Sequence, residues 1–226
     1  IALFVEPDVD TDGAAKEGAL TFGPQMRAVV GQLRRPVLAW LFGFAVFATV
    51  VNHIPYEFYQ PYIDLVGLEL GLSGHTPLAT GIHMAVTTSI GALLARKSAD
   101  IDDRIGTRPT LLAAGAIQVA VIAAMAAVLH PLILLVILLR GTPKALAAAP
   151  LRAAVTPRIP KGQRATYLSL QSLVGRLAFA GLLAGLGAVA GTADPESWQT
   201  LSTLLWYATA VGGIGLALLA VFGRGD

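Results

Sequence analysis

Two arginines lie inside long apolar stretches of this sequence, where a positive charge is costly. The stretch that contains Arg140 begins at Pro131. If the stretch is helical, Arg140 lies at a depth of ~14 Å from that end. Arg176 lies at a similar depth in a later stretch. An arginine at the centre of a membrane helix costs about 2.5–3.5 kcal/mol on insertion scales, so it is rarely left facing lipid. We predict that both bind a substrate or a counter-charge; the alternative is a structural tie to helix-end carbonyls.

Polar side chains near Arg176 favour the first interpretation. Ser169, Ser172 and Arg176 have the spacing of one helical face. Asn52 adds a polar group to an earlier apolar stretch. We expect these residues to line a polar cavity. Lys144, nearer the end of its stretch, is expected to extend its ammonium group to water.

Three ionisable residues are candidates for carrying protons, and they lie near the loop that joins the first two apolar stretches. His53 and Glu57 lie one helical turn apart, and His83 lies at a similar depth in the next stretch. Histidine and glutamate carry protons through many membrane proteins. The alternative is a hydrogen-bonded cluster at the membrane surface with the tyrosines of the same region, Tyr56, Tyr59 and Tyr62.

A charged turn, ADIDDRIGTRP, separates two of the apolar stretches. It contains Asp103, Arg104, Gly106 and Arg108, in the pattern D-R-x-G-x-R. Glycine suits a turn that needs positive φ. The alternative is a solvated turn whose arginines only set the orientation of the protein in the membrane.

The composition requires a membrane. Of the 226 residues, 55% are hydrophobic and 13% are charged, whereas soluble domains carry about 25% charged residues. Cysteine is absent, which excludes disulfides, thiolate catalysis and cysteine-ligated metals. The four histidines show no metal-ligand spacing. The small net charge of +2, without basic and aromatic clusters, argues against nucleic acid. We therefore expect no metal and no cofactor.

Six apolar stretches are long enough to cross the hydrocarbon core as helices. The sequence therefore predicts an all-α, polytopic membrane protein with six transmembrane helices. The stretches are 36–60, 77–95, 109–129, 131–151, 165–190 and 199–222.

Basic residues mark one end of these helices. Of the 16 Lys and Arg, all but Arg140, Lys144 and Arg176 fall in segments 6–35, 96–108, 152–164 and the C-terminus. The opposite loops hold no basic residue and carry Asp64, Glu69, Asp194 and Glu196. By the positive-inside rule, both ends of the six-span bundle are expected in the cytoplasm.

The chain divides into three parts. Residues 1–5 have the character of the end of a preceding transmembrane helix, which suggests a fragment rather than a signal peptide. Residues 6–35 are expected to form a cytoplasmic central loop with a short amphipathic helix. Residues 36–226 form the predicted six-helix transmembrane bundle.

The sequence resembles the C-terminal half of a major facilitator superfamily transporter. ADIDDRIGTRP is similar to the family's loop motif G-x-x-x-D-R-x-G-R-R, although Ala99 and Thr107 depart from it. RIPKGQRATYLSLQSLVGRL, residues 158–177, resembles the family's entry into its eleventh helix. The resemblance implies that the six spans are helices seven to twelve and that the N-terminal six-helix half is missing.

The resemblance also implies a function. The chain would be half of a secondary transporter in a bacterial inner membrane, moving a small solute or drug by alternating access, with proton-coupled efflux the expected mode. The charged turn would act as a cytoplasmic gate. The first, second, fourth and fifth spans would line the cavity, whereas the third and sixth would face lipid, so tryptophan is expected to be tolerated at Ala114, Val121, Ala208 and Leu216.

Two other functions compete. Gly71-Leu-Ser-Gly74 fits the G-x-S-G motif of six-helix intramembrane proteases. However, Ser73 lies in a loop and no histidine follows His130, although the general base of those enzymes comes from a later helix. A membrane scaffold without transport is the other alternative, and the arginines within the spans argue against it. We therefore expect that the protein is not an enzyme.

Overall fold

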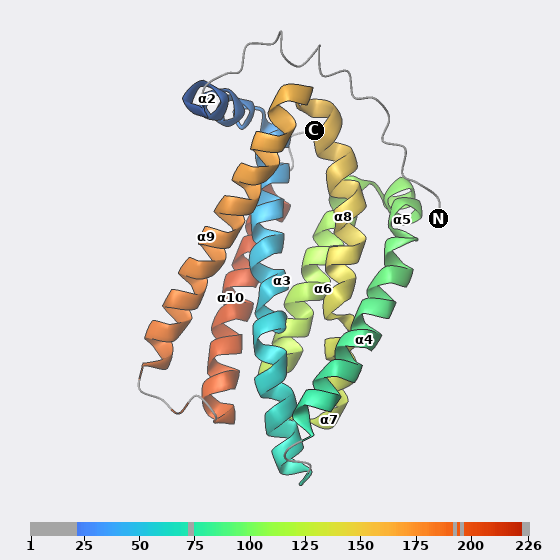
Figure 1. Ribbon diagram of the computed structural model, residues 1–226, viewed down its shortest axis with the longest axis vertical. Helices are drawn as coiled ribbons and strands as arrows, with labels where there is room; N and C mark the ends of the chain where they lie inside the picture. The colour runs from blue at the N-terminus through green and yellow to red at the C-terminus, as the bar shows by residue number, and fades with distance from the viewer. Residues whose placement is uncertain (1–21, 72–74, 192–193, 195–196, 223–226) are drawn as a thin grey trace, which may run out of the picture.

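The computed structural model describes residues 22–71, 75–191, 194 and 197–222 and contains six helices long and apolar enough to cross a membrane. The described residues are almost entirely helical and form no strand. The long helices run roughly side by side, with α3 in front of α6 and between α9 and α4 (Figure 1). The predicted all-α, six-span fold is confirmed.

The first span is longer than predicted. Helix α3 runs from Pro36 to Glu69, passing through Pro55 and Pro61, so the loop expected over 61–76 is mostly helical. Its last turns remain helical because Tyr62, Ile63 and Val66 are buried in the core. The Tyr62 hydroxyl donates to the carbonyl of Val128 at 2.7 Å and accepts from the His130 amide at 3.1 Å.

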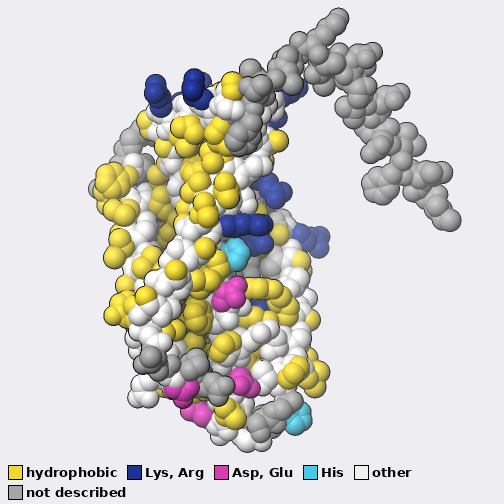
Figure 2. Space-filling view, turned by 60° about the vertical axis from the view of Figure 1, so that its left-hand side comes forward, with side chains coloured by type: hydrophobic (Ala, Val, Ile, Leu, Met, Phe, Trp, Pro, Cys, Tyr) yellow, Lys and Arg dark blue, Asp and Glu magenta, His cyan; other side chains and the backbone are white. Residues whose placement is uncertain are grey.

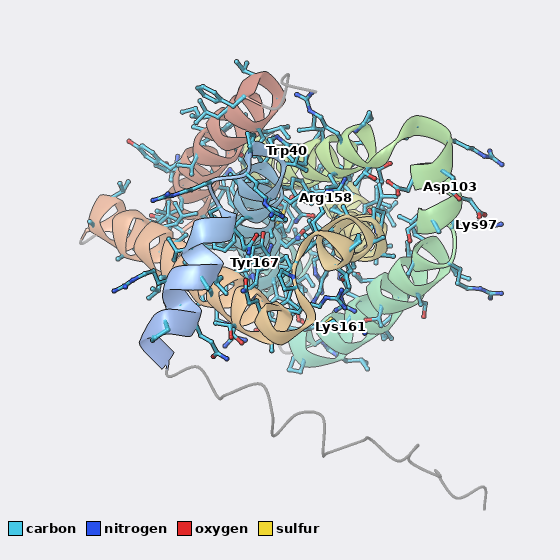
Figure 3. The ribbon with its side chains drawn as sticks, turned by 90° about the horizontal axis from the view of Figure 1, so that it is seen from above. Trp40, Lys97, Asp103, Arg158, Lys161 and Tyr167 are labelled. Atoms are coloured by element: carbon cyan, nitrogen blue, oxygen red, sulfur yellow. The ribbon has the colours of Figure 1, made fainter. Side chains whose placement is uncertain are left out.

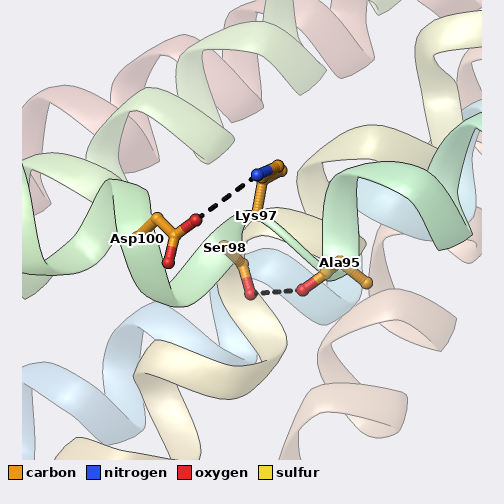
Figure 4. A network of polar contacts seen from close by, with 4 residues as sticks. All are labelled: Ala95, Lys97, Ser98 and Asp100. Carbon is orange, nitrogen blue, oxygen red and sulfur yellow. Dashed lines mark hydrogen bonds and ion pairs between the residues drawn. The ribbon is translucent and has the colours of Figure 1, made fainter.

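The charged turn is itself helical. Helix α4 (Thr76–Ala95) is followed by the short helix α5 (Ser98–Ile105) and then by α6 (Thr107–Ala127). Ser98 donates to the carbonyl of Ala95 at 2.9 Å, and Lys97 pairs with Asp100 at 3.7 Å (Figure 4). Gly106 joins α5 to α6 with a φ of +87°, a conformation that glycine adopts without strain.

The fourth span is broken in its middle. Helix α7 (Pro131–Ile137) passes through a 3₁₀ turn, η1 (Leu138–Gly141), into α8 (Thr142–Val155). Pro143 has no N–H to donate to the carbonyl of Leu139, so the α-helical ladder cannot continue there. The hydroxyl of Thr142 donates to that carbonyl instead, at 2.8 Å.

The remaining helices complete the bundle. The 3₁₀ turns η2 (Thr156–Arg158) and η3 (Lys161–Gln163) lead into α9 (Arg164–Ala190), and α10 (Trp198–Phe222) follows. The expected amphipathic helix is α2 (Phe22–Gln32). It buries Val29 and lies across the end of the bundle, where Gln32 donates to the Gln163 side chain at 3.0 Å (Figure 1).

The third span is the most deeply buried one. Half of the most apolar stretch of α6 is buried, against 17% for α4 and 11% for α9. The expectation that Ala114, Val121 and Ala208 face lipid is wrong, because they are at most 3% exposed, and tryptophan at these positions is now expected to disturb the packing. Helices α6 and α10 therefore turn these residues toward their neighbours.

Glycines permit close packing between helices at three positions. A side chain at Gly115 or Gly215 would meet the ring of Phe47 at 3.0 Å or less, and one at Gly175 would meet Thr49 at 2.9 Å. Gly181 and Gly185, by contrast, face open space within this chain. Helix α9 therefore approaches α3 at Gly175 and is bare at its later glycines.

Charge separates the two ends of the bundle. In Figure 2, lysine and arginine side chains lie mainly in the upper half of the visible face and acidic ones in the lower half. We call the upper end, where α3, α6 and α9 begin and α4, α8 and α10 end, the basic end. This distribution agrees with the predicted placing of basic segments at one end of the bundle.

Candidate functional site in the membrane

Arg140 forms the centre of a buried polar cluster. It is only 6% exposed. Its Nη1 donates to Nδ1 of His83 at 2.8 Å and approaches the Thr87 hydroxyl at 3.5 Å, and its Nη2 lies 3.2 Å from the sulfur of Met84. All three partners lie on α4, so one helix face holds the guanidinium.

These contacts fix the protonation state of His83. A guanidinium has no acceptor, so Nδ1 of His83 must accept from Arg140 through its lone pair. Nε2 then carries the proton and donates to the carbonyl of Leu134 at 3.0 Å. His83 is therefore neutral while it is bonded to Arg140, because a proton on Nδ1 would remove the acceptor and place two cations in contact.

Tyr59 closes the cluster from α3. The guanidinium carbon of Arg140 lies 3.9 Å from the centre of the Tyr59 ring, and this ring also stacks on His83 at 6.1 Å. A cation over an aromatic face is stabilised by about 2 kcal/mol when desolvated. Among the described residues, no acidic side chain pairs with Arg140. The groups that contact the buried positive charge in this cluster are therefore all neutral.

The break in the fourth span creates this arrangement. A side chain at Gly141 would lie 3.1 Å from a methyl carbon of Thr87 and 3.3 Å from its carbonyl oxygen, so glycine is needed for the close approach of η1 to α4. Arg140 is the neighbour of that glycine and meets the Thr87 turn directly. Breaks of this kind often mark functional positions in membrane transport proteins.

The second predicted arginine lies elsewhere. Ser169, Ser172 and Arg176 are exposed and share one face of α9, as their spacing predicted. Helices α9 and α4 flank α3 on opposite sides (Figure 1). The structure of this chain therefore does not join Arg176 to the Arg140 cluster, and their shared cavity stays a prediction. Lys144 is exposed, and the extension of its ammonium group to water stays a prediction.

The three proton-carrying candidates do not form one cluster. His53 is exposed, donates from Nδ1 to the carbonyl of Thr49 at 2.6 Å, and packs against Phe179 on α9 at 5.0 Å. Glu57 is exposed. Only His83 is buried, in the Arg140 cluster.

Asn52 is half-buried on α3. It lines a small cavity of about 10 Å³ with Gln118 of α6, which is fully buried. Neither amide group of this pair is satisfied by the described residues: Oδ1 of Asn52 and both polar atoms of Gln118 have no partner there. Asn52 thus lies, half-buried, between α3 and α6, and its place in a substrate cavity stays a prediction.

The charged turn contacts the bundle through Arg108. Its Nη2 donates to the carbonyl of Ala220 at 2.7 Å, in the last turn of α10, and its guanidinium lies 6.0 Å from the ring of Trp40. Trp40 in turn donates to the Leu219 carbonyl at 2.9 Å. Asp103 and Arg104 are exposed, and the acid that bonds within the turn is Asp102, to Thr107 at 3.3 Å.

Several of these residues escaped the sequence analysis. Thr87 lies one helical turn after His83, and this spacing, which places both on one helix face, is the signal that could have found it. Tyr59 was considered only as part of a surface cluster. Met84 and Asp102 carried no signal of their own.

A comparison with protein-family models gives the class of the protein. The model of the Major Facilitator Superfamily matches residues 1–182. The chain belongs to the major facilitator superfamily. Its members are membrane transporters and are generally not enzymes. No curated protein and no solved structure matches the chain significantly.

Membership of the superfamily agrees with the resemblance found in the sequence. It does not favour the intramembrane protease. Ser73 of the protease-like motif lies outside the described residues, and His130 caps α7 by accepting from the Leu132 amide at 3.1 Å.

Proposed function

We propose that this superfamily chain is the C-terminal half of a proton-coupled secondary transporter for a small solute with an anionic group. The observation that carries the proposal is the guanidinium of Arg140, buried at 6% exposure and held only by neutral partners. A buried cation without a counter-charge favours the binding of an anion, because pairing recovers part of the cost of its desolvation.

His83 supplies the coupling step of this proposal. Its neutral ring accepts from Arg140 at 2.8 Å. Uptake of a proton at Nδ1 breaks that bond and adds a second positive charge beside the guanidinium. Arg140 is then released toward an anion, so proton binding and solute binding favour each other. His53 and Glu57 on the exposed side of α3 are further candidates for the proton route.

The bare surfaces of α4 and α9 support a missing N-terminal half. The most apolar stretch of α9 is the least buried of the six at 11%, and those of α4 and α10 follow at 17% each. Arg176, Ser169 and Ser172 lie on such a surface, where a charge needs protein or water rather than lipid. In this proposal a second six-helix half covers both helices, and the space between the halves is the substrate cavity.

The remaining parts of the proposal concern orientation and gating. The basic end lies in the cytoplasm, with both ends of the bundle on that side, by the positive-inside rule. The membrane is the bacterial inner membrane. Because the proton and the solute favour each other's binding, this site couples them as symport, which an inward proton gradient drives as uptake rather than as the efflux expected from the resemblance. The bond from Arg108 to α10 forms a cytoplasmic latch, and Asp103 and Arg104 are placed to contact the other half.

Solute-driven proton flux tests the function. The two proposed halves, encoded together or co-expressed, are reconstituted in vesicles that enclose a pH-sensitive dye. Carboxylates and phosphate esters are added as a panel, each beside a neutral analogue of similar size. We expect at least one anion to change the internal pH, while its neutral analogue does not. Flux driven equally well by the neutral analogues would contradict an anion-binding Arg140.

A further inference from the structure

A cavity at the basic end lies apart from the proposed transport site and has a different lining. It has a volume of about 400 Å³ and lies between the first turns of α3 and α6 and the last turns of α8 and α10. This volume is in the range of small-ligand sites. Trp40 and Arg158, two of its lining residues, appear together in the view of this end in Figure 3. The cavity is separate from Arg140, which does not line it.

The walls combine positive charge with apolar surface. Arg108 and Arg158 supply the charge, and Trp40, Leu41 and Phe222 supply much of the apolar lining. The described residues that line the cavity include no acidic side chain. Such a lining fits a ligand with an anionic head and an apolar body.

The arginines keep donors free for a ligand. Arg108 uses Nη2 for the Ala220 carbonyl, but its Nε is buried and has no partner among the described residues. Arg158 uses Nη1 for the carbonyl of Ala154 at 2.6 Å and is otherwise exposed. Guanidinium groups bind phosphate oxygens with two parallel hydrogen bonds, for which these arginines retain unused N–H groups.

We propose that this cavity binds the phosphate headgroup of an anionic phospholipid from the leaflet at the basic end. The location favours a lipid over a free anion, because the cavity lies at the ends of four membrane-spanning segments, at the depth of headgroups. Basic pockets between transmembrane helices are known to select anionic headgroups. Trp40 suits the same depth, because indole rings prefer the interface between headgroups and acyl chains.

Lipid-dependent thermal stability tests the site. The purified protein in mild detergent is titrated with phosphatidylglycerol, with phosphatidylcholine of the same acyl chains, and with free glycerol 3-phosphate. We expect phosphatidylglycerol alone to raise the unfolding midpoint. An equal rise with glycerol 3-phosphate would show a site for free anions, and an equal rise with phosphatidylcholine would show that charge is irrelevant. Either result, or no rise at all, would overturn the proposal.

Two variants test the cavity itself. Arg158→Gln removes an exposed charge, and Ala153→Leu fills the cavity without changing charge; both residues line it. Each is expected to weaken the apparent affinity for phosphatidylglycerol about tenfold. Arg152→Gln is the matched control, because Arg152 is exposed on α8 but does not line the cavity. Equal weakening by the control would mean that only the general surface charge attracts the lipid.

Discussion

Arg140 and His83 are 57 positions apart in the sequence and bond to each other at 2.8 Å inside the membrane-spanning bundle. The bond exists only while the imidazole is neutral, because the guanidinium can only donate. A proton and an anion therefore act on the same contact. The first two predictions follow from this relationship.

Arg140→Gln should abolish transport while the protein still inserts in the membrane. Glutamine keeps a donor for His83 but loses the charge that binds the anion, and loss of a buried charge contact costs about 2–5 kcal/mol. We expect uptake in vesicles to fall by at least about thirtyfold. The control is Lys144→Gln, which removes an exposed charge from the same span. Unchanged transport by Arg140→Gln would show that this arginine is structural.

His83→Gln should separate transport from proton coupling. The glutamine oxygen can accept from Arg140, but it does not take up a proton. We expect solute exchange between equal internal and external pools to continue, whereas solute-driven pH change is lost. Exchange and dye signal are measured on the same vesicles. A variant that keeps its full pH signal would show that the proton follows another route, for which His53 and Glu57 are the candidates.

Gly175→Ala and Gly181→Ala test packing on a single helix. An added methyl at Gly175 meets Thr49 at 2.9 Å, whereas the one at Gly181 meets nothing within 4 Å. We expect the first to destabilise the protein by about 1–3 kcal/mol through overpacking. The second should be neutral or stabilise α9 by up to about 1 kcal/mol, through helix propensity. Thermal unfolding in detergent gives both values, and equal midpoints would contradict the close approach of α9 to α3.

Gln118→Leu should raise stability. The amide of Gln118 is fully buried and finds no partner among the described residues. Replacing it by an apolar group of similar size removes a desolvation cost of about 1–3 kcal/mol. Gln118→Glu is the opposite change and should lower the unfolding midpoint, because a buried carboxyl group is costlier still. A lower midpoint for Gln118→Leu would show that the amide is satisfied in the membrane.

Cysteine labelling tests the orientation. The sequence has no cysteine, so single cysteines at His75, Gln199 and Asp103, all exposed, report without background. An impermeant thiol reagent added to intact cells should label the first two, and should label the third only after the membrane is opened. Labelling at position 103 in intact cells would reverse the proposed topology.

The features that depend on local composition and spacing could be predicted from the sequence. Apolar stretches are long enough to count as spans, so all six helices were found, and the serine and arginine face of α9 follows from spacing alone. The end of α3 was missed because residues 61–76, with Gly67, Gly71 and Gly74, suggested a loop. Burial of Tyr62 and Val66 against distant residues keeps the helix intact.

The candidate site depended on contacts across the chain. The depth of Arg140 was visible in the sequence, but its partner His83 was not, because no local rule pairs residues on different helices. The same holds for Arg108 and the carbonyl of Ala220, which lie 112 positions apart. The break at η1 could have been predicted from the sequence, since Gly141, Thr142 and Pro143 together disfavour a continuous α-helix.

That break has a mechanical consequence. An unbroken helix transmits rotation and tilt along its length, whereas the fourth span is joined at Gly141 by a single 3₁₀ turn and one side-chain hydrogen bond from Thr142. Its outer part, α7, carries the Leu134 carbonyl that holds His83, and its inner part, α8, leads to the cavity at the basic end. A 3₁₀ stretch inside a helix is often a hinge, so we expect a rearrangement on one side of the membrane to be carried less rigidly to the other.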